Sequence, residues 1–426
     1  MTIPDAELLG FDEALYLQRY QDVAEAVACG EWPSGYSHYC IVGRTEGRSG
    51  SHEVDETWYQ KAYPKVRGEI DAGWAANARD HYLRVGRHRG YLPNKTAPRP
   101  NNAADFRSRF GGLWVDLANA RDLIRGRLDL GAITPQQAAL LCKWVHDGYV
   151  TIENAVPEEI LDRALADVNK AYEGGFPSLR FNVHGVGRNL SWISPVQANP
   201  TKALDLHWFS TSVREAIFSD KVLEFLHLLF ERRALATQTL TMWRGSAQDG
   251  HQDSAYVMYS LPMQFCASWI ALEDVHEDSG ELFYHVGGQR MAEYLYHGRY
   301  KSVAEARRLQ PESDVADAMT EHVEFIKQKA YGMSLPTERF LAKRGDVLLW
   351  SADLPHGGSS ISPVFTRKSI VTHYCPAEIV PFYFEDGRRN EIRRYEGKAY
   401  YSSGSYGGNS RDVSKPSANG PSAETG

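Results

Sequence analysis

Several features common in membrane proteins and nucleic-acid-binding proteins are missing from this sequence of 426 residues. No apolar stretch approaches the ~20 residues that a helix needs to cross a lipid bilayer. The amino-terminal MTIPDAELLGFDEALY lacks the basic segment and the apolar core of a secretory signal. Runs of basic residues are also missing, and the formal net charge is -7. Because nucleic-acid binding depends on positive charge, we expect no nucleic-acid partner, no membrane span and no secretory leader.

Cysteine is scarce, and its distribution excludes the usual cysteine-based sites. The five cysteines are an odd number, stand far apart and include no CxxC pair: Cys29, Cys40, Cys142, Cys266 and Cys375. Secreted domains that depend on disulfides carry closely spaced, even sets of cysteines. We therefore expect reduced thiols in a cytoplasmic protein.

The chain is long enough for more than one domain, since domains usually have ~100–200 residues. Hydrophobic residues make up 42% of the sequence and charged residues 24%, which is the balance of a globular chain with a buried core. We therefore expect two or three folded units.

The amino-terminal part contains an internal repeat with an offset of 43 residues. FDEALYLQRYQDV, from Phe11, aligns with VDETWYQKAYPKV, from Val54. SHYCIVGRTEGR, from Ser37, aligns with DHYLRVGRHRGY, from Asp80. Aromatic and apolar residues recur at spacings of three and four, which predicts a helical pair in each unit. The alignment superposes Tyr16 on Tyr59, Tyr20 on Tyr63, Val23 on Val66, His38 on His81, Tyr39 on Tyr82, Gly43 on Gly86 and Gly47 on Gly90.

We assign this repeat to a small all-α domain over residues 1–94, with units at 11–53 and 54–94. The units resemble short helical modules of the form DxxYYLxxYPDV…HYxxxGxxEGR, found beside bacterial glycosyltransferases and other cell-surface polysaccharide proteins. The resemblance implies a glycan context. The plainer interpretation is an accessory domain without a ligand, in which His38 and His81 are packing residues. Two repeats rarely form a stable solenoid alone, so we expect them to pack on the catalytic domain or to mediate oligomerisation.

The remaining chain divides by composition. Residues 95–104, KTAPRPNNAA, have the Pro and Asn content of a linker, and residues 105–401 form the expected catalytic domain. From Thr237 onward many short predicted strands with turn signals favour a barrel or sandwich. Residues 289–340 interrupt these strands with charged helical sequence, long enough for a lid over a barrel mouth. The Gly/Ser/Pro-rich residues 402–426 are expected to be disordered.

The motif His251-Gln252-Asp253, followed by His356, has the residue types of a metal site. On a strand, His251 and Asp253 point to the same side, and His356 can approach from a neighbouring strand. Two imidazoles and one carboxylate bind a metal on one face, the arrangement of non-haem Fe(II) oxygenases, whereas sites built only from oxygen ligands favour Mg or Ca. The HxD pair alone arises often by chance. The distal histidine and an arginine eleven residues beyond it, Arg367, give it weight.

The segment TRKSIVTHY predicts a strand on which Arg367, Ser369, Val371 and His373 share one face. A guanidinium with a hydroxyl two residues on can grip the carboxylate of a keto-acid cosubstrate. The alternative is that Arg367 ends a surface strand and pairs with an acidic side chain. For His373, a core histidine with satisfied hydrogen bonds is the preferred interpretation, and a place inside the barrel is the alternative.

Four segments carry a second resemblance, to the phytanoyl-CoA dioxygenase (PhyH-like) family of Fe(II)/2-oxoglutarate-dependent oxygenases. They are DGYVTIENAVPEEILDRALADV, HQDSAY, SWIALEDVHEDSGELFYHVGG and GDVLLWSADLPHGGSSISPVFTRKSIVTHYCP, which together span about residues 147–376. The resemblance implies an α+β fold, with a double-stranded β-helix (jelly-roll, cupin-like) core flanked by helices. It also implies that the enzyme uses Fe(II), 2-oxoglutarate and O2.

The same resemblance assigns roles to individual residues. His251, Asp253 and His356 would bind the iron, and Arg367 would pair with the distal carboxylate of 2-oxoglutarate. Two further positions match contacts to the cosubstrate in relatives: Trp269, sixteen residues past Asp253, and Gln252. Related halogenases replace the carboxylate with a small residue, so the presence of Asp253 favours hydroxylation or another oxidation over halogenation.

One departure from the family concerns the substrate. Many relatives carry Pro-Gly-Ser-His after the GxL strand, where this chain has Val286-Gly287-Gly288-Gln289-Arg290. Coenzyme A thioesters are therefore not carried over as substrates. Four side chains could line the substrate pocket, although ordinary surface or core roles fit them as well: Arg244, Tyr256, Tyr259 and Arg290.

We therefore expect a dioxygenase that hydroxylates an aliphatic carbon of a small polar substrate and releases succinate and CO2. A sugar or a sugar-linked metabolite is one candidate substrate. Two alternatives from other classes stay open. One is a catalytically silent jelly-roll that binds glycans, and the other is a zinc-dependent hydrolase that uses the same three ligands.

Overall fold

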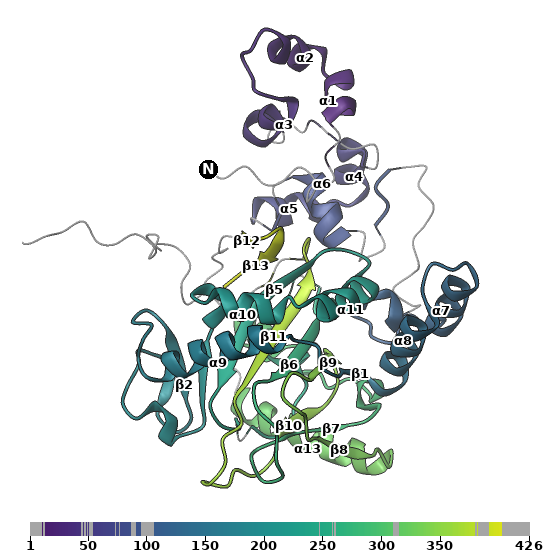
Figure 1. Ribbon diagram of the computed structural model, residues 1–426. Helices are drawn as coiled ribbons and strands as arrows, with labels where there is room; N and C mark the ends of the chain where they lie inside the picture. The colour runs from purple at the N-terminus through teal and green to yellow at the C-terminus, as the bar shows by residue number, and fades with distance from the viewer. Residues whose placement is uncertain are drawn as a thin grey trace, which may run out of the picture.

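The computed structural model describes residues 11, 13–43, 46, 48, 50, 54–72, 74–75, 77–86, 91–94, 106–246, 248–257, 259, 261–309, 315–379, 381 and 392–402 (Figure 1). The expected linker, 95–104, lies outside the described residues, as do Gly47 and Gly90 of the repeat alignment. Ser402, where the expected tail begins, is buried and donates a hydrogen bond to Asp205 Oδ2 over 3.2 Å. The rest of that tail, 403–426, lies outside the described residues.

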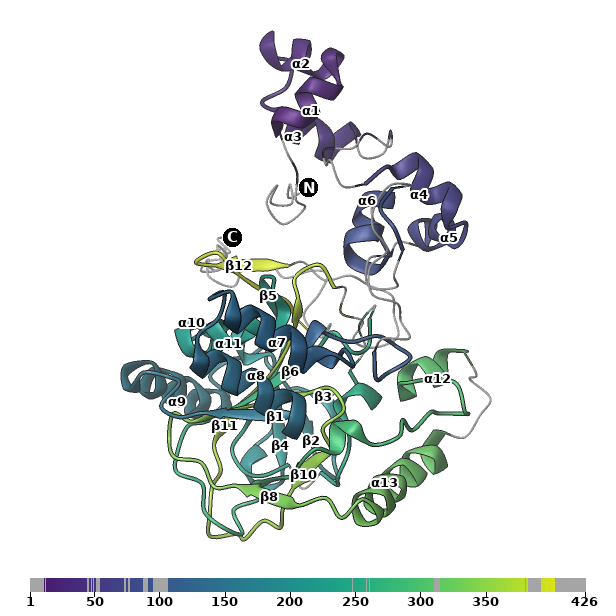
Figure 2. The ribbon, with the colours of Figure 1, turned by 90° about the vertical axis from the view of Figure 1, so that its right-hand side faces the viewer.

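Each repeat unit contains three short α-helices and a π-helical turn, where the sequence predicted a helical pair. The third helix has only four residues and continues directly into the π-helical turn, so the periodicity merges the two. Figures 1 and 2 show both units as an arm on the β12–β13 side of the core. The first unit has α1 (Glu13–Arg19), α2 (Gln21–Ala28), α3 (Gly35–His38) and the turn Tyr39–Gly43, and the second has α4 (Glu56–Ala62), α5 (Lys65–Asp71), α6 (Ala78–His81) and the turn Tyr82–Gly86.

A tyrosine–histidine hydrogen bond closes both units at the same repeat position. Tyr16 Oη lies 3.1 Å from His38 Nδ1, and Tyr59 Oη lies 3.0 Å from His81 Nδ1. Both tyrosines are fully buried. The two histidines therefore pack beside tyrosines, and each satisfies the phenol that its unit buries.

A glycine faces each of these buried tyrosines. A Cβ on Gly43 would collide with the hydroxyl of Tyr16, and a Cβ on Gly86 would collide with the hydroxyl of Tyr59. The glycines that recur in the sequence repeat are thus required by close packing, since no other residue leaves room for the phenol.

The helices of the catalytic part surround one face of a large sheet. Local signals set their ends: α8 (Pro135–Asp147) starts with a capping box between Thr134 and Gln137 and stops at Gly148, whose φ is 84°. Buried side chains of these helices form one core with the outward side chains of the sheet. The other helices of this layer are α7 (Ala120–Asp129), α9 (Glu158–Tyr172), α10 (Thr211–Ile217) and α11 (Asp220–Phe230).

Two antiparallel sheets form the core. The larger has the order β1-β9-β6-β11-β5-β4-β2-β3, with β13 pairing parallel with β5, and the smaller has the order β10-β7-β8. These sheets and the flanking helices confirm the predicted α+β class with a double-stranded β-helix core. The strands are β1 (Tyr149–Ile152), β2 (Arg180–Val183), β3 (Gly187–Leu190), β4 (Thr201–Leu204), β5 (Ala234–Met242), β6 (Cys266–Ala271), β7 (Leu282–His285), β8 (Thr337–Phe340), β9 (Val347–Ser351), β10 (His356–Gly358), β11 (Ser369–Pro376), β12 (Arg393–Tyr395) and β13 (Lys398–Tyr400).

Alternation along β11 separates the two faces of the large sheet. Ile370 and Tyr374 pack into the core shared with the helices, whereas Val371 and Cys375 pack into the core inside the barrel. Ser369 and His373 share the inward face with Val371 because side chains on a strand alternate. The strand therefore directs a polar face toward the interior between the sheets.

The expected lid contains α12 (Val303–Leu309) and α13 (Val315–Gly332), which lie side by side at the periphery of the core in Figure 2. Its last residues form β8, which pairs with β7 of the smaller sheet. Tyr296 and Tyr300 of the same segment pack on Ala255, two residues after Asp253. None of the helices in the described part combines the length and the apolar character that a bilayer crossing requires.

Candidate metal and cosubstrate site

Three predicted ligands meet inside the barrel. Backbone hydrogen bonds of 2.9 Å in both directions join His251 to His356. Asp253 begins a short 3-10 turn, Asp253–Ala255, so His251 and Asp253 do not share a regular strand as the sequence suggested. Hydrogen bonding of the turn to the loop after β9, from Ser254 N to Ala352 O, accounts for the difference. One ligand atom from each of the three buried side chains lies within 4.8 Å of the others.

Backbone carbonyl groups orient the two imidazoles. His251 Nδ1 lies 2.8 Å from Asp249 O, and His356 Nδ1 lies 2.9 Å from Leu354 O. Each Nδ1 therefore carries the proton, and each Nε2 has its lone pair directed toward the carboxylate of Asp253, 3.7 Å away. Fixing the tautomer in this way is a usual feature of histidine metal ligands.

The protonation states of the cluster suit a metal. Burial lowers the pKa of His356 to about 4, so its imidazole is neutral at pH 7. Burial alone would raise the pKa of Asp253, but the neighbouring imidazoles of His356 and His251 lower it overall, so the carboxylate is ionised. Neutral imidazoles and a carboxylate are the forms that bind a divalent metal. The donor set fits iron or zinc better than an oxygen-only ion such as Mg²⁺.

Arg367 lies deep in the barrel, with 1% of its surface exposed. One guanidinium nitrogen donates to Gly280 O, and Nη2 lies 3.2 Å from Met242 Sδ. Its Cζ is 5.3 Å from the ring centre of Trp269. No carboxylate pairs with it among the described residues, which contradicts the alternative of a surface arginine paired with an acid. Burial lowers the pKa of Arg367 to about 10, so it stays charged at neutral pH.

Three buried polar atoms around this guanidinium have no hydrogen-bond partner in the described part of the chain: Arg367 Nε, Ser369 Oγ and Trp269 Nε1. Val371 pairs with Trp269 across β11 and β6, which brings the three side chains to one region of the interior. An unsatisfied buried polar group costs about 1–3 kcal/mol. The cluster is therefore suited to an anionic ligand with several acceptor oxygens.

The side chain of Gln252 makes its hydrogen bonds with the loop after β9 and with the expected lid. Its Nε2 donates to Asp353 O over 2.7 Å, and its Oε1 lies 3.3 Å from His322 Nε2 on α13. Burial lowers the pKa of His322 to about 4, so the neutral ring donates to Gln252 and accepts from Tyr296 Oη at 3.0 Å. The amide of Gln252 therefore joins the metal-binding segment to the expected lid.

A second contact ties the same two parts together. Lys301 Nζ lies 2.8 Å from Asp353 Oδ2 and 3.1 Å from Glu293 Oε1, and it is almost completely buried. The other carboxylate oxygen of Asp353 accepts from Ser254 Oγ. Because Ser254 follows Asp253 directly, the charged network reaches the metal-binding segment.

Sequence reasoning missed Lys202 of β4. Its Nζ donates to Gln248 Oε1 over 2.6 Å, and it lies opposite Met242, the residue that contacts Arg367. Burial lowers the pKa of Lys202 to about 8, the charge of Arg367 acts in the same direction, and Asp253 opposes both. No local signal marks this lysine, because only the pairing of β4 with β5 brings it to the site.

His373 differs from the preferred expectation of a satisfied core histidine. It is buried on the inward face of β11, and its Nδ1 has no hydrogen-bond partner within the described ranges. Its ring lies 5.3 Å from that of Phe265. Burial lowers the pKa of His373 to about 4, with Asp253 acting against this shift. The histidine thus faces the interior close to the metal cluster.

The four side chains that could line the substrate pocket lie in different parts of the structure. The ring of Tyr256 lies 5.5 Å from that of His251, close to the metal cluster. The hydroxyl of Tyr259 hydrogen-bonds with Thr237 over 2.7 Å inside the barrel. Arg244 Nε is buried without a partner among the described residues, and Arg290 lines a cavity treated below.

Comparisons with known proteins add to this geometry. The profile of the Phytanoyl-CoA dioxygenase (PhyH) family matches residues 144–369. A search of curated proteins finds no match.

Similar solved structures include the epimerase SnoN with Fe3+, alpha ketoglutarate and nogalamycin RO (13% identity, 62% of this chain and 98% of that chain, TM-score 0.45). Another is the carbocyclase SnoK from nogalamycin biosynthesis (13% identity, 59% of this chain and 87% of that chain, TM-score 0.42). A third is EctD from S. alaskensis with 2-oxoglutarate and 5-hydroxyectoine (14% identity, 57% of this chain and 76% of that chain, TM-score 0.39).

Proposed function

The chain belongs to the phytanoyl-CoA dioxygenase (PhyH) family of non-haem oxygenases that use Fe(II), 2-oxoglutarate and O2, and on this premise we propose that it hydroxylates an aliphatic carbon of a small polar substrate. Succinate and CO2 are the expected co-products. The buried cluster of two histidines and one aspartate supports iron as the metal, because this donor set leaves positions open for other ligands.

We assign His251, Asp253 and His356 as the ligands that would hold the iron. Bound iron, together with the keto acid, supplies the activation of dioxygen that C–H oxidation requires. The residues around the triad fix its shape: carbonyl groups hold the two imidazoles, and the indole of Trp350 donates to Asp253 Oδ2. The protein thereby presents three donors in fixed orientations from one side.

The observation that carries the proposal is the buried guanidinium of Arg367, which forms no ion pair with a carboxylate in the described part of the chain. A charge at this depth is stable only with a counter-ion, and the unpartnered atoms of Ser369 and Trp269 beside it can donate to the same ligand. A dicarboxylate fits this role, with one carboxylate at Arg367 and the other end directed toward the metal cluster. Lys202 adds a second positive charge, which interacts with both Asp253 and Arg367.

Residues 289–340 are proposed as the lid that excludes water. Two buried contacts support the assignment, the hydrogen bond from His322 to Gln252 and the ion pair between Lys301 and Asp353. Both end on segments that carry metal ligands, so closure of the lid and the shape of the metal site depend on each other. Excluding water strengthens the electrostatic interactions inside the site.

A sugar or sugar-linked metabolite is the proposed substrate type, on the basis of the resemblance of the amino-terminal repeats to modules found beside glycosyltransferases. The test is incubation of the iron-loaded protein with 2-oxoglutarate and a panel of sugars, sugar conjugates and small polar metabolites that contain no sugar. A product heavier by one oxygen atom would support the assignment. Turnover of a panel member without any sugar component, and of no other, would contradict it.

The reaction class is tested by oxygen-dependent conversion of 2-oxoglutarate to succinate with added Fe(II). Asp253→Ala should abolish both iron binding and turnover, because it removes the only carboxylate of the triad. Asp249→Ala is the matched control, since this exposed carboxylate lies in the same loop and only its backbone carbonyl contacts His251. Zinc in place of iron after anaerobic purification, or equal turnover in both variants, would contradict the proposal.

A further inference from the structure

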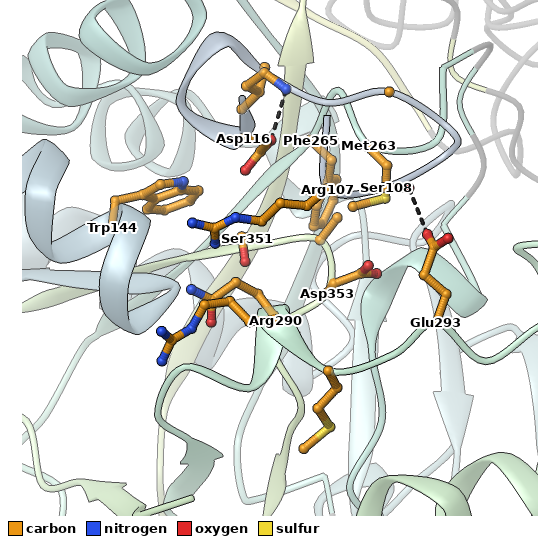
Figure 3. A pocket seen from close by; sticks show the side chains of 15 residues that line it. Arg107, Ser108, Asp116, Trp144, Met263, Phe265, Arg290, Glu293, Ser351 and Asp353 are labelled. Carbon is orange, nitrogen blue, oxygen red and sulfur yellow. Dashed lines mark hydrogen bonds between the residues drawn. The ribbon is translucent and has the colours of Figure 1, made fainter. Parts of the chain in front are cut away.

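A cavity of about 270 Å³ lies beside the metal cluster, and none of the three proposed ligands lines it. Its wall combines segments that are distant in the sequence, namely the stretch before α7, helix α8, the start of β6, the start of the lid and the end of β9 (Figure 3). Trp144 and Phe265 give it apolar sides, and Arg107, Arg290 and Ser351 give it polar ones. This mixture is typical of a binding site for a small molecule.

Three polar side chains of this cavity have few or no partners in the part of the chain that the structure describes. Ser351 Oγ is buried without a hydrogen-bond partner among the described residues, and its residue is 7% exposed. Arg107 makes no ion pair or side-chain hydrogen bond with any described residue, and the guanidinium of Arg290 donates only to Gly287 O, over 3.3 Å. Figure 3 shows both arginine side chains extending toward the same side of the cavity.

The two guanidinium groups are close enough to affect each other. Burial lowers the pKa of Arg107, and the positive charges of Arg290 and Arg121 lower it further, against the opposing effect of Asp116. Burial raises the pKa of Asp116 to about 6, so this carboxylate stays largely ionised at pH 7, but it accepts from Leu113 N over 2.8 Å and forms no ion pair with Arg107. Such a pair of guanidiniums matches the geometry of a carboxylate or a phosphate.

The other acids in the wall are already engaged. Glu293 accepts from Ser108 and from Lys301, and Asp353 accepts from Lys301 and from Ser254. Neither carboxylate forms an ion pair with Arg107 or Arg290. The positive charge of the cavity is therefore available to a ligand.

Two of the residues that line the cavity also lie close to the metal cluster. Phe265 lines it, and its ring lies 5.3 Å from that of His373 on the inward face of β11. Asp353 lines it and stands three residues before His356, so their Cα atoms are at most about 11 Å apart. A small molecule with one end in the cavity can thus place a carbon atom near the proposed iron site.

We propose that this cavity binds the anionic group of the substrate, a phosphate monoester or a carboxylate, through the guanidinium groups of Arg107 and Arg290 and the hydroxyl of Ser351. The reacting carbon then lies beyond Phe265, on the side of His373. The statement about the substrate rests on the proposed hydroxylase function, whereas the binding of an anion does not.

Titration calorimetry on the full-length, metal-free protein tests the binding step, with inorganic phosphate and acetate as the two probes. Arg107→Gln and Arg290→Gln should each weaken binding of the preferred probe at least tenfold, and Ser351→Ala should weaken it less. Arg109→Gln is the matched control, because Arg109 is exposed on the same segment and does not line the cavity. Arg367→Gln reports on the cosubstrate position, because the guanidinium of Arg367 is itself suited to an anion, so binding there is lost in this variant and kept in the cavity variants.

Each result has a defined meaning. A binding event that the cavity variants lose and Arg367→Gln keeps supports the proposal, and the stronger probe identifies the phosphate or the carboxylate as the preferred group. Equal binding in the wild type and the cavity variants overturns it, as does loss in Arg367→Gln alone, which would place the anion at the cosubstrate position. Failure of the wild type to bind either probe also overturns it. Because no iron is present, a negative oxygenase assay would leave these results unchanged.

Discussion

The indole nitrogen of Trp350 donates a hydrogen bond to Oδ2 of Asp253 over 2.8 Å. The ring of Trp350 also packs on His356, with centres 4.9 Å apart. One side chain thus holds both a carboxylate and an imidazole of the proposed metal site. Its place at the end of β9 makes this strand a support for the cluster.

Trp350→Phe should weaken Fe(II) binding by about 10–100-fold, as is usual when the hydrogen bond to a ligand carboxylate is removed. An anaerobic iron titration measures the effect. Trp192→Phe removes an indole hydrogen bond of 2.9 Å to Tyr172 O, away from the site, and controls for general loss of stability. The same iron affinity in the wild type and both variants would show that Trp350 has only a packing role.

Arg367→Gln should raise the KM for 2-oxoglutarate by about 10–100-fold, since it removes charge-assisted hydrogen bonds to the cosubstrate. Arg367→Lys keeps the positive charge but lacks the two parallel N–H donors of a guanidinium, and it should have a smaller effect. Steady-state kinetics, with iron affinity measured in parallel, separates this from damage to the metal site. A fall in iron affinity of similar size would contradict the assigned role.

The KM for 2-oxoglutarate should rise as the pH increases through about 8. Lys202, whose pKa burial lowers to about 8, is positively charged below this pH and neutral above it. The dianionic cosubstrate therefore loses a favourable charge interaction at alkaline pH. Lys202→Arg should remove the dependence, because arginine stays protonated. A pH profile of KM that is the same in both proteins would exclude Lys202 from cosubstrate binding.

His322→Ala should loosen α13 over the site. It removes the hydrogen bonds to Gln252 and Tyr296, each of which contributes about 1 kcal/mol. Hydrogen exchange over residues 315–332 should accelerate by roughly thirtyfold, the equivalent of about 2 kcal/mol. Lys327→Ala is the control on the same helix, because Lys327 is exposed and, of the described residues, forms an ion pair with Glu324 alone. Unchanged exchange in His322→Ala would show that other contacts hold the helix.

Gly86→Ala should destabilise the second repeat by about 1–3 kcal/mol, because the added methyl group meets the hydroxyl of Tyr59. Gly68→Ala, in the middle of α5, meets nothing within 4 Å and should stabilise that helix by up to about 1 kcal/mol. Limited proteolysis of the 54–94 region measures both. Succinate formation should be the same in both variants if the repeats are accessory, and a loss in Gly86→Ala would contradict that role.

The sequence predicted the parts of the site that depend on local spacing. The HxD motif, the distal histidine and the arginine stand in short segments, so each could be recognised before the strands were arranged. Lys202 and Trp350 could not be recognised in this way, because β4 and β9 reach the cluster only through the strand order of the large sheet. The alternation of TRKSIVTHY placed His373 on the inward face, but its lack of a hydrogen-bond partner depends on side chains from other strands.

The fold class followed from many short strands and from the resemblance, whereas finer features of the chain did not. The third helices of the repeats have only four residues each, too few for a clear period. The turn at Asp253 was missed because a hydrogen bond to Ala352, a hundred residues away in the chain, sets its shape.

The matching tyrosine–histidine pairs have a consequence for how such chains can change in length. Each pair, with its facing glycine, is satisfied within its own unit of 43 residues. Between the units, Asn77 Nδ2 donates to Tyr39 Oη over 2.9 Å. A further unit inserted in register would contain its own tyrosine–histidine pair and facing glycine. It would need only one new set of contacts between neighbouring units. The arm can therefore gain or lose whole repeat units without compensating substitutions in the barrel.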